Sequence, residues 1–183
     1  YRRATERLTS RQRLVLLFVA SVLGLFLEIC LIRWHGTEFR AAAYFKNVTL
    51  LACFLGLGLG YALADRPRVY FPWAMVLLAA HVLVLDLLSR MGIDSFLKLP
   101  QGSSQIWVWG VQTSESVTRL GAFGQGAIFY GFFLFLFVIT VVVFIPIGQL
   151  TGLLMSGLPV LQAYTVNILG GLCGVVLFTV VSY

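Results

Sequence analysis

The fold class is decided by the apolar segment LVLLFVASVLGLFLEICLI at residues 14–32, which only Ser21, Gly24 and Glu28 interrupt. A helix needs about 20 mainly apolar residues to cross the hydrocarbon core of a bilayer. Further stretches of this kind lie at residues 47–64, 71–88, 127–147 and 161–183. Because all of these runs lack the polar alternation of barrel strands, the sequence predicts an all-α integral membrane bundle with about five transmembrane helices.

The composition of the chain supports the same conclusion. Of its 183 residues, 60% are hydrophobic and 11% are charged, and the mean hydropathy is +0.94. A soluble domain usually carries about 25% charged residues, so these values exclude a soluble globule, a disordered chain and a nucleic-acid-binding domain. We expect the lipid bilayer to be the environment of this protein and no nucleic acid to be a partner.

The orientation can be predicted from Lys and Arg, because cytoplasmic flanks carry an excess of these residues. With the N-terminal arm inside, seven basic residues lie inside, namely Arg2, Arg3, Arg7, Arg11, Arg13, Arg66 and Arg68. Six lie outside, namely Arg33, Arg40, Lys46, Arg90, Lys98 and Arg119. The five arginines beside the first helix decide this near tie, since the first helix usually dominates. We therefore expect a multi-pass protein of the cell (inner) membrane with a cytoplasmic N-terminus.

Four regions follow from these spans. Residues 1–13 form a basic cytoplasmic arm, residues 14–88 a three-helix membrane unit and residues 126–183 a two-helix membrane unit. The polar segment between them, residues 89–125, is long for a connection within a compact membrane domain. Its Trp107 and Trp109 suit an anchor at the headgroup level. We expect an extracytoplasmic loop or cap there, and a binding loop is the alternative.

Ionisable residues at membrane depth are the first candidates for a site, because each costs about 2.5 to 3.5 kcal/mol on insertion scales. The chain has Glu28, His81 and Asp86 within its spans, and Arg33 and Lys46 flank the same outer level. One hypothesis is an intramembrane polar network in which these acids and bases neutralise each other and hold the first three helices together. The alternative is a proton or cation path, or a polar substrate pocket, lined by Glu28 and Asp86.

The sequence offers little support for metal or catalytic chemistry. His81 has no second histidine at ligand spacing, and His35 is placed on the other side of a loop. The three cysteines lie far apart without a CxxC pair, which is typical of free thiols that act as small hydrophobes. We therefore expect no metal site and no bound cofactor, and the chain shows no catalytic constellation, so enzymatic activity stays an open question.

Glycines recur at a spacing of four within the predicted helices. The pairs are Gly56 with Gly60, Gly148 with Gly152, and Gly170 with Gly174. A phosphate-binding loop would need a preceding strand and solvent access, whereas glycines four apart in an apolar helix let a second helix approach closely. We therefore predict that these six glycines pack helices together. The Phe-rich helix at 127–147 carries no ionisable residue and is expected to face lipid, with a pigment or an apolar partner as the alternatives.

Three segments together resemble a known family. They are FLEICLIRWHGTEFR at 26–40 with YFKN at 44–47, then FLGLGLG at 54–60 with ADR at 64–66, and finally YTVNILGGLCG at 164–174. This ordered set resembles the N-terminal membrane domain of spermidine-synthase-like proteins. In that family a multi-helix membrane region precedes an aminopropyltransferase-type Rossmann domain. The resemblance implies that any chemistry lies on a soluble domain that these 183 residues do not contain.

Three functions therefore stay open. The resemblance implies a non-catalytic transmembrane anchoring domain of a spermidine-synthase-like membrane protein. The chain could instead be an accessory or scaffold subunit of a larger membrane complex, with other membrane subunits or further copies of itself as partners. A small-molecule or ion transporter that uses Glu28 and Asp86 is the third possibility.

Overall fold

The computed structural model describes residues 8–66, 71–92 and 119–183, and each regular element in these ranges is a helix. The elements are α2 (Ser10–Glu38), α3 (Arg40–Tyr44), α4 (Lys46–Ala62), η1 (Phe71–Trp73), α5 (Ala74–Arg90), α6 (Arg119–Ser156) and α7 (Val160–Val181). Most of the expected basic arm and of the 89–125 segment, including Trp107 and Trp109, lies outside the described residues.

Four helical segments are long and apolar enough to cross a membrane. They are Ser10–Glu38, Phe71–Arg90, Gly126–Ser156 and Val160–Val181. The apolar helix α4 has 17 residues and so reaches about 25 Å at 1.5 Å per residue, slightly less than the bilayer core. The prediction of an all-α multi-pass membrane bundle is confirmed, with large apolar side chains exposed toward the lipid on its outer surfaces.

Two helices are longer than the sequence pattern indicated. The first apolar run ends at Ile32, but α2 continues to Glu38 and so includes His35. The fourth run ends near Pro146, yet α6 continues through this proline to Ser156. A single polar residue does not end a helix when tertiary contacts hold the next turn in place, and the extra turn of α2 is what brings His35 to the site described below.

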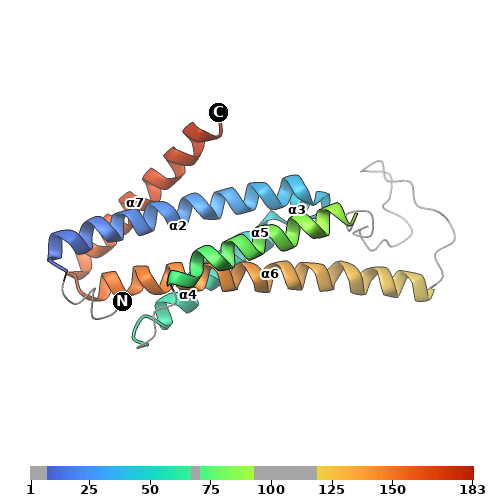
Figure 1. Ribbon diagram of the computed structural model, residues 1–183, viewed down its shortest axis with the longest axis horizontal. Helices are drawn as coiled ribbons and strands as arrows, with labels where there is room; N and C mark the ends of the chain where they lie inside the picture. The colour runs from blue at the N-terminus through green and yellow to red at the C-terminus, as the bar shows by residue number, and fades with distance from the viewer. Residues whose placement is uncertain (1–7, 67–70, 93–118) are drawn as a thin grey trace.

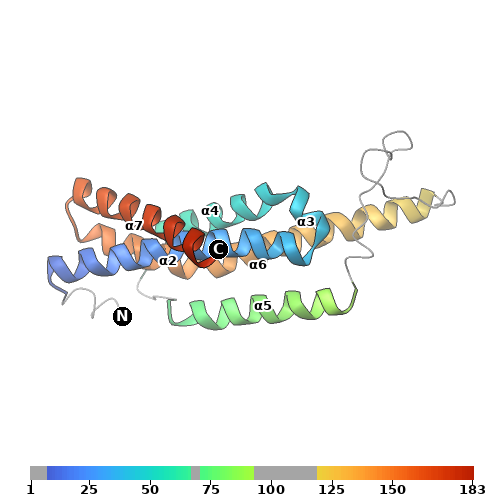
Figure 2. The same cartoon turned by 90° about the horizontal axis from the view of Figure 1, so that it is seen from above.

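The helices form three layers (Figures 1 and 2). The antiparallel helices α2 and α6 run through the middle, α4 and α7 lie on one side, and α5 lies on the other. Helix α4 packs along α6, and α7 packs along α2, whereas α6 and α7 have few direct contacts. Residues 126–183 therefore do not pack as a separate pair of helices, since each of the two is held by a helix from residues 14–88.

The glycines of α4 and α6 lie where the backbones of these helices meet. A Cβ atom on Gly56 would lie 2.6 Å from the backbone oxygen of Val141, and one on Gly60 would lie 2.5 Å from a backbone oxygen of α6. On the facing helix, a Cβ on Gly148 would collide with the backbone of α4, and one on Gly152 would lie 3.0 Å from the nearest side chain. The two helices therefore approach to a distance that only glycine permits.

The contact between α2 and α7 combines two glycines with a polar bond. A Cβ on Gly170 would lie 2.7 Å from the Cβ of Ser21, and one on Gly174 would lie 2.6 Å from a backbone oxygen of α2. The Ser21 hydroxyl lies 2.7 Å from Oδ1 of Asn167 and also 2.7 Å from the backbone oxygen of Leu17. Close packing and a hydrogen bond thus join the same turn of the two helices.

Helix α6 is the most buried of the long apolar helices, which corrects in part the expectation that the Phe-rich segment faces lipid. In the apolar part of α6, 44% of the residues are buried, compared with 11% for α7. Phe129, Phe132, Phe133 and Phe144 are all buried. Helices α2, α4 and α5 all pack on α6, whereas Tyr130, Leu134 and Val138 on its remaining face stay exposed.

Candidate functional site

Two histidines meet in the interior of the bundle. Nε2 of His35 on α2 lies 2.9 Å from Nε2 of His81 on α5, and the two rings meet edge to edge, with their centroids 5.1 Å apart and their planes inclined by 27°. The exposed fraction is 1% for His35 and 0% for His81. A hydrogen bond between two imidazoles therefore joins α2 to α5 within the apolar part of the protein.

A third helix contributes the other partner of His35. Nδ1 of His35 lies 3.1 Å from the hydroxyl oxygen of Thr49 on α4, and Thr49 is buried as well. The ring of Trp34 lies beside both imidazoles, with its centroid 5.5 Å from that of His35 and 6.1 Å from that of His81. The three polar side chains thus connect α2, α4 and α5, and an aromatic ring covers one side of the pair.

Apolar clusters enclose the polar group on two sides. Phe39 and Leu85 belong to the cluster toward the end of α2, and Leu31 and Cys53 belong to the cluster in the middle of the bundle. Trp34 packs against both clusters. In so apolar an environment a hydrogen bond is electrostatically stronger than in water, and an unpaired polar atom is costly. Loss of a hydrogen-bond partner of either imidazole should therefore cost more stability here than at a surface.

The hydrogen bond between the rings restricts their charge. One Nε2 atom must carry a hydrogen and the other must offer a lone pair. At most one of the two imidazoles can therefore be positively charged while the bond exists. The pair can hold zero or one extra proton, and either ring can be the donor.

Helix α5 has a second polar contact with α2. The hydroxyl of Ser89 donates a hydrogen bond of 2.9 Å to Oε2 of Glu38. Only Ala74, His81 and Leu85 of α5 are buried. The hydrogen bonds of His81 and Ser89 therefore add to the apolar contacts of Leu77, Leu78 and Leu85, which pack this helix on the bundle.

Glu28 is buried two helical turns before His35 on the same face of α2. Its exposed fraction is 2%, and its Oε2 atom has no hydrogen-bond partner among the described residues. Glu28 is therefore a buried carboxyl group in the middle of the bundle.

The other residues of the expected network lie elsewhere. Arg33 is exposed with its guanidinium carbon 5.9 Å from the centre of the Phe178 ring, and Lys46 is exposed. Asp86 forms a 2.8 Å ion pair with Arg90, one turn later on α5. Among the described residues no ion pair joins Glu28 to Arg33 or Lys46. The structure thus brings His81 to His35 instead of gathering Glu28, Arg33, Lys46 and Asp86 in one layer.

The sequence alone does not identify His35, Thr49 and Trp34 as members of a site. The first apolar run ends at Ile32, which leaves His35 beyond the predicted span and on the other side of a loop from His81. One signal was available, since His35 follows Glu28 by seven residues and residues seven apart lie on the same face of a helix. No comparable pattern in the sequence pairs His35 with His81, which lies on another helix.

Replacing Glu28 with glutamine tests whether its charge holds helices together. Removing one partner of a buried ion pair costs about 3–5 kcal/mol, but no cation contacts Glu28 among the described residues. We therefore expect the free energy of unfolding in lipid–detergent bicelles to stay the same for Glu28→Gln. The control is Glu38→Gln, the same substitution at a carboxylate that does have a partner, the Ser89 hydroxyl. A loss of several kcal/mol in Glu28→Gln alone would restore the ion-pair hypothesis.

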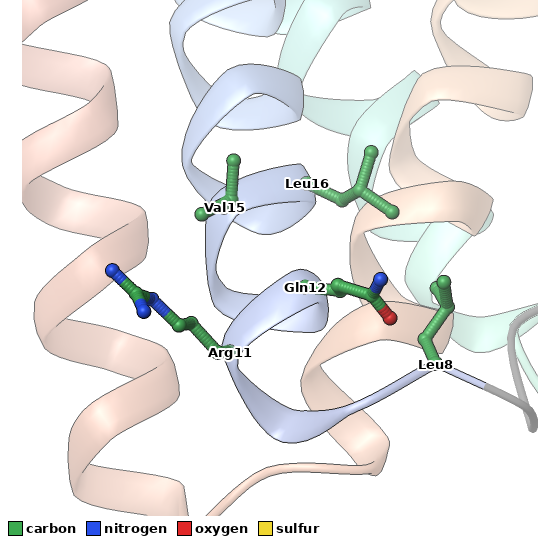
Figure 3. Close-up of a pocket in the computed structure, with 5 residues that line it drawn as sticks. All are labelled: Leu8, Arg11, Gln12, Val15 and Leu16. Atoms are coloured by element: carbon green, nitrogen blue, oxygen red, sulfur yellow. The ribbon is translucent and has the colours of Figure 1, made fainter.

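Two hollows lie at the end of the bundle where α2 begins. One of about 410 Å³ is lined by Leu8, Arg11, Gln12, Val15 and Leu16, and its side chains point in different directions around the start of α2 (Figure 3). The other, of about 530 Å³, lies between α4 and the turn from α6 to α7, with Tyr61 and Tyr164 in its lining. Both are open, and neither contains a residue of the histidine site.

Within residues 8–66, 71–92 and 119–183, no three His, Cys, Asp or Glu side chains gather as a metal centre would need. Comparisons of the chain with protein-family models, with curated proteins and with solved structures find no match.

Proposed function

We propose that this chain is the non-catalytic membrane-anchoring domain of a spermidine-synthase-like membrane protein, held in the cell membrane with its N-terminus in the cytoplasm. The proposal rests on the resemblance of the segments at 26–47, 54–66 and 164–174 to that family. The first segment includes His35, and the second and third include four of the six packing glycines. The residues that carry the resemblance are thus also residues that hold the helices together.

The observation that supports anchoring best is the close packing of the helix backbones. Four glycines join α4 to α6, and two join α2 to α7, at distances where a methyl group would not fit. Buried polar side chains add bonds between helices, since Ser21 joins α2 to α7 and His35 joins α2 to α5. A bundle built in this way keeps one arrangement, which suits a domain that holds a partner domain at the membrane.

An accessory subunit is the second candidate, and helix α7 is the observation that favours it. Only 11% of its apolar segment is buried, and Leu161, Ile168 and Val180 are among its exposed residues. Such a surface suits lipid, another membrane subunit or a second copy of the chain. The transporter hypothesis predicts a proton or solute flux that Asp86→Asn abolishes, whereas both other functions predict no flux in proteoliposomes.

The orientation and the anchoring can be tested together. We expect a soluble reporter fused to either end of the chain to stay in the membrane fraction after carbonate extraction, because five apolar helices hold it there. A reporter that is active only in the cytoplasm should be active when it is fused to the N-terminus. A reporter that is active only on the opposite side of the membrane should be inactive at the same position. The opposite pattern, or extraction of the fusion by carbonate, would contradict the proposal.

A further inference from the structure

We propose that the hollow between the end of α4 and the turn from α6 to α7 binds the headgroup of a phospholipid that carries a phosphate and a primary ammonium group. Asp65 binds the ammonium group, and the hydroxyls of Tyr61 and Tyr164 bind the phosphate. The proposal requires only that the bundle spans a membrane, so it holds or fails independently of the anchoring function.

The hollow lies where the ends of three helices meet. Its volume of about 530 Å³ falls within the range of about 300–1,000 Å³ of pockets that hold small ligands. Its polar lining comes from the end of α4, the end of α6 and the first turns of α7, namely Tyr61, Asp65, Ser156, Tyr164 and Asn167. Helices α4 and α7 lie on the same side of the bundle (Figure 2), so they form two walls of one site.

Charged residues place this hollow at the level of the lipid headgroups. Asp65 and Arg66 directly follow the apolar helix α4, and Arg11 and Arg13 directly precede the apolar run of α2. The hollow lies at the same end of the bundle as these four residues. Tyrosine is enriched at this level of a bilayer, because its ring suits the apolar side and its hydroxyl the polar side.

Both walls of the hollow are held in place by the protein itself. The Gln149 amide donates a hydrogen bond of 3.0 Å to a backbone oxygen just after α4. A Cβ atom on Gly152 would lie 3.0 Å from the Tyr61 ring, so this ring packs directly on the backbone of α6. On the other side, the 2.7 Å bond between Ser21 and Asn167 holds α7 on α2. A site formed in advance loses less entropy when it binds a ligand.

The charges beside the hollow are arranged as a zwitterion requires. Asp65 is an exposed carboxylate on the α4 side, and a carboxylate can accept several hydrogen bonds at once. On the opposite side, a Cβ atom on Gly157 would collide with the guanidinium of Arg13, and Gly157 follows the lining residue Ser156. A negative group at one edge and a positive group at the other complement an ammonium and a phosphate.

The two tyrosines supply neutral donors for the phosphate. Both are exposed and belong to the lining of the hollow, so a ligand can reach them. A phenol hydroxyl that donates to a charged oxygen forms a stronger hydrogen bond than one between neutral groups. Together with the charge of Arg13, Tyr61 and Tyr164 therefore favour a phosphate on the side of the hollow away from Asp65.

The surface of α7 provides a place for the acyl chains, which favours a lipid over a soluble molecule with the same headgroup. Tyr164 of the lining is followed on α7 by Ile168 and Leu172, and all three are exposed. Residues four apart lie on one face of a helix. An apolar stripe thus runs from the hollow toward the middle of the bilayer.

Binding can be measured by native mass spectrometry of the full chain in detergent micelles. Phosphatidylethanolamine, phosphatidylcholine and phosphatidylglycerol are added separately at equal concentrations. We expect one molecule of phosphatidylethanolamine to bind more tightly than either other lipid. The ammonium of phosphatidylcholine is trimethylated and cannot donate a hydrogen bond, and phosphatidylglycerol has no cation.

Replacing Asp65 with asparagine tests the ammonium contact. Asp65→Asn should weaken the binding of phosphatidylethanolamine about tenfold, roughly the effect of one hydrogen bond to a charged group. It should leave the binding of phosphatidylcholine unchanged, so the preference for phosphatidylethanolamine is lost. A merely structural role of Asp65 would change the binding of both lipids alike, and that result would contradict the proposal.

The phosphate contact is tested by the double variant Tyr61→Phe with Tyr164→Phe, which keeps both rings and removes both hydroxyls. It should weaken the binding of all three lipids by a similar factor, because they share the phosphate. Tyr130→Phe is the matched control, since Tyr130 is exposed on α6 outside the hollow, and it should change nothing. Equal binding of the three lipids by the unaltered chain would overturn the proposal. Displacement of the lipid by an equal concentration of soluble phosphoethanolamine would overturn its assignment to a lipid.

Discussion

Replacing Gly60 with alanine is expected to destabilise the bundle by about 1–3 kcal/mol, the usual range for a group forced into a packed interior. A Cβ atom at this position would lie 2.5 Å from a backbone oxygen of α6. Backbone atoms on two long helices cannot move aside as a flexible side chain can. The added methyl group should therefore push α4 and α6 apart, and the free energy of unfolding in bicelles would measure the loss.

The control for this prediction lies two residues earlier on the same helix. A Cβ atom on Gly58 would meet no atom within 4 Å, so Gly58→Ala should change the stability by less than about 0.5 kcal/mol, as is usual for surface substitutions. Both variants add the same methyl group to the same apolar helix. Equal effects of Gly58→Ala and Gly60→Ala would show that α4 does not pack on α6 at this face.

Replacing His81 with leucine is the second change with a large expected effect. The substitution leaves Nε2 of His35 buried without its partner, which costs about 1–3 kcal/mol. Because α5 buries few residues, we expect the loss to be concentrated in this helix. Hydrogen–deuterium exchange of the backbone amides should become faster in Ala74–Arg90, while α7 should keep its exchange rates.

A double-mutant cycle shows whether the two histidines act through each other. His35→Leu and His81→Leu each leave a polar atom unpaired, whereas the double variant removes both ring systems and leaves only Thr49 without its bond. The loss in the double variant should therefore be clearly smaller than the sum of the two single losses. Leu83→Ala on the exposed side of α5 is the control and should change little. Additive losses would contradict the bond between the rings.

The membrane fold could be predicted from the sequence because its cause is local. The length and continuity of the apolar runs are visible in the order of residues, and they are enough to predict a helical bundle. The ends of the helices were less accurate, as the extension of α2 to Glu38 and of α6 to Ser156 shows. Those extra turns depend on contacts with other helices, which the sequence of one segment does not contain.

The candidate site depended on contacts between distant residues and was largely missed. His35 and His81 are 46 positions apart, and no periodic pattern connects one helix to another. Charge alone suggested that Glu28, Arg33, Lys46 and Asp86 would gather at one level. In the structure Arg33 lies against Phe178 on α7, and Asp86 pairs with Arg90 one turn later on its own helix.

The histidine pair gives the membrane domain a feature that simple anchoring does not require. Two apolar residues of similar size would join α2 and α5 without a buried polar atom, and such replacements are often neutral or stabilising. The polar contact instead places three buried polar side chains between α2, α4 and α5.

The most direct test of the anchoring proposal is the intact mass of the native polypeptide, measured under denaturing conditions after purification from its membrane. The 183 residues account for 20.3 kDa. We expect a mass that exceeds this value by a whole soluble domain, with polyamine or methyl-donor chemistry as the next activity to assay. A native mass within a few kDa of 20.3 kDa would contradict the proposal and would favour an accessory subunit whose function lies in the proteins that it binds.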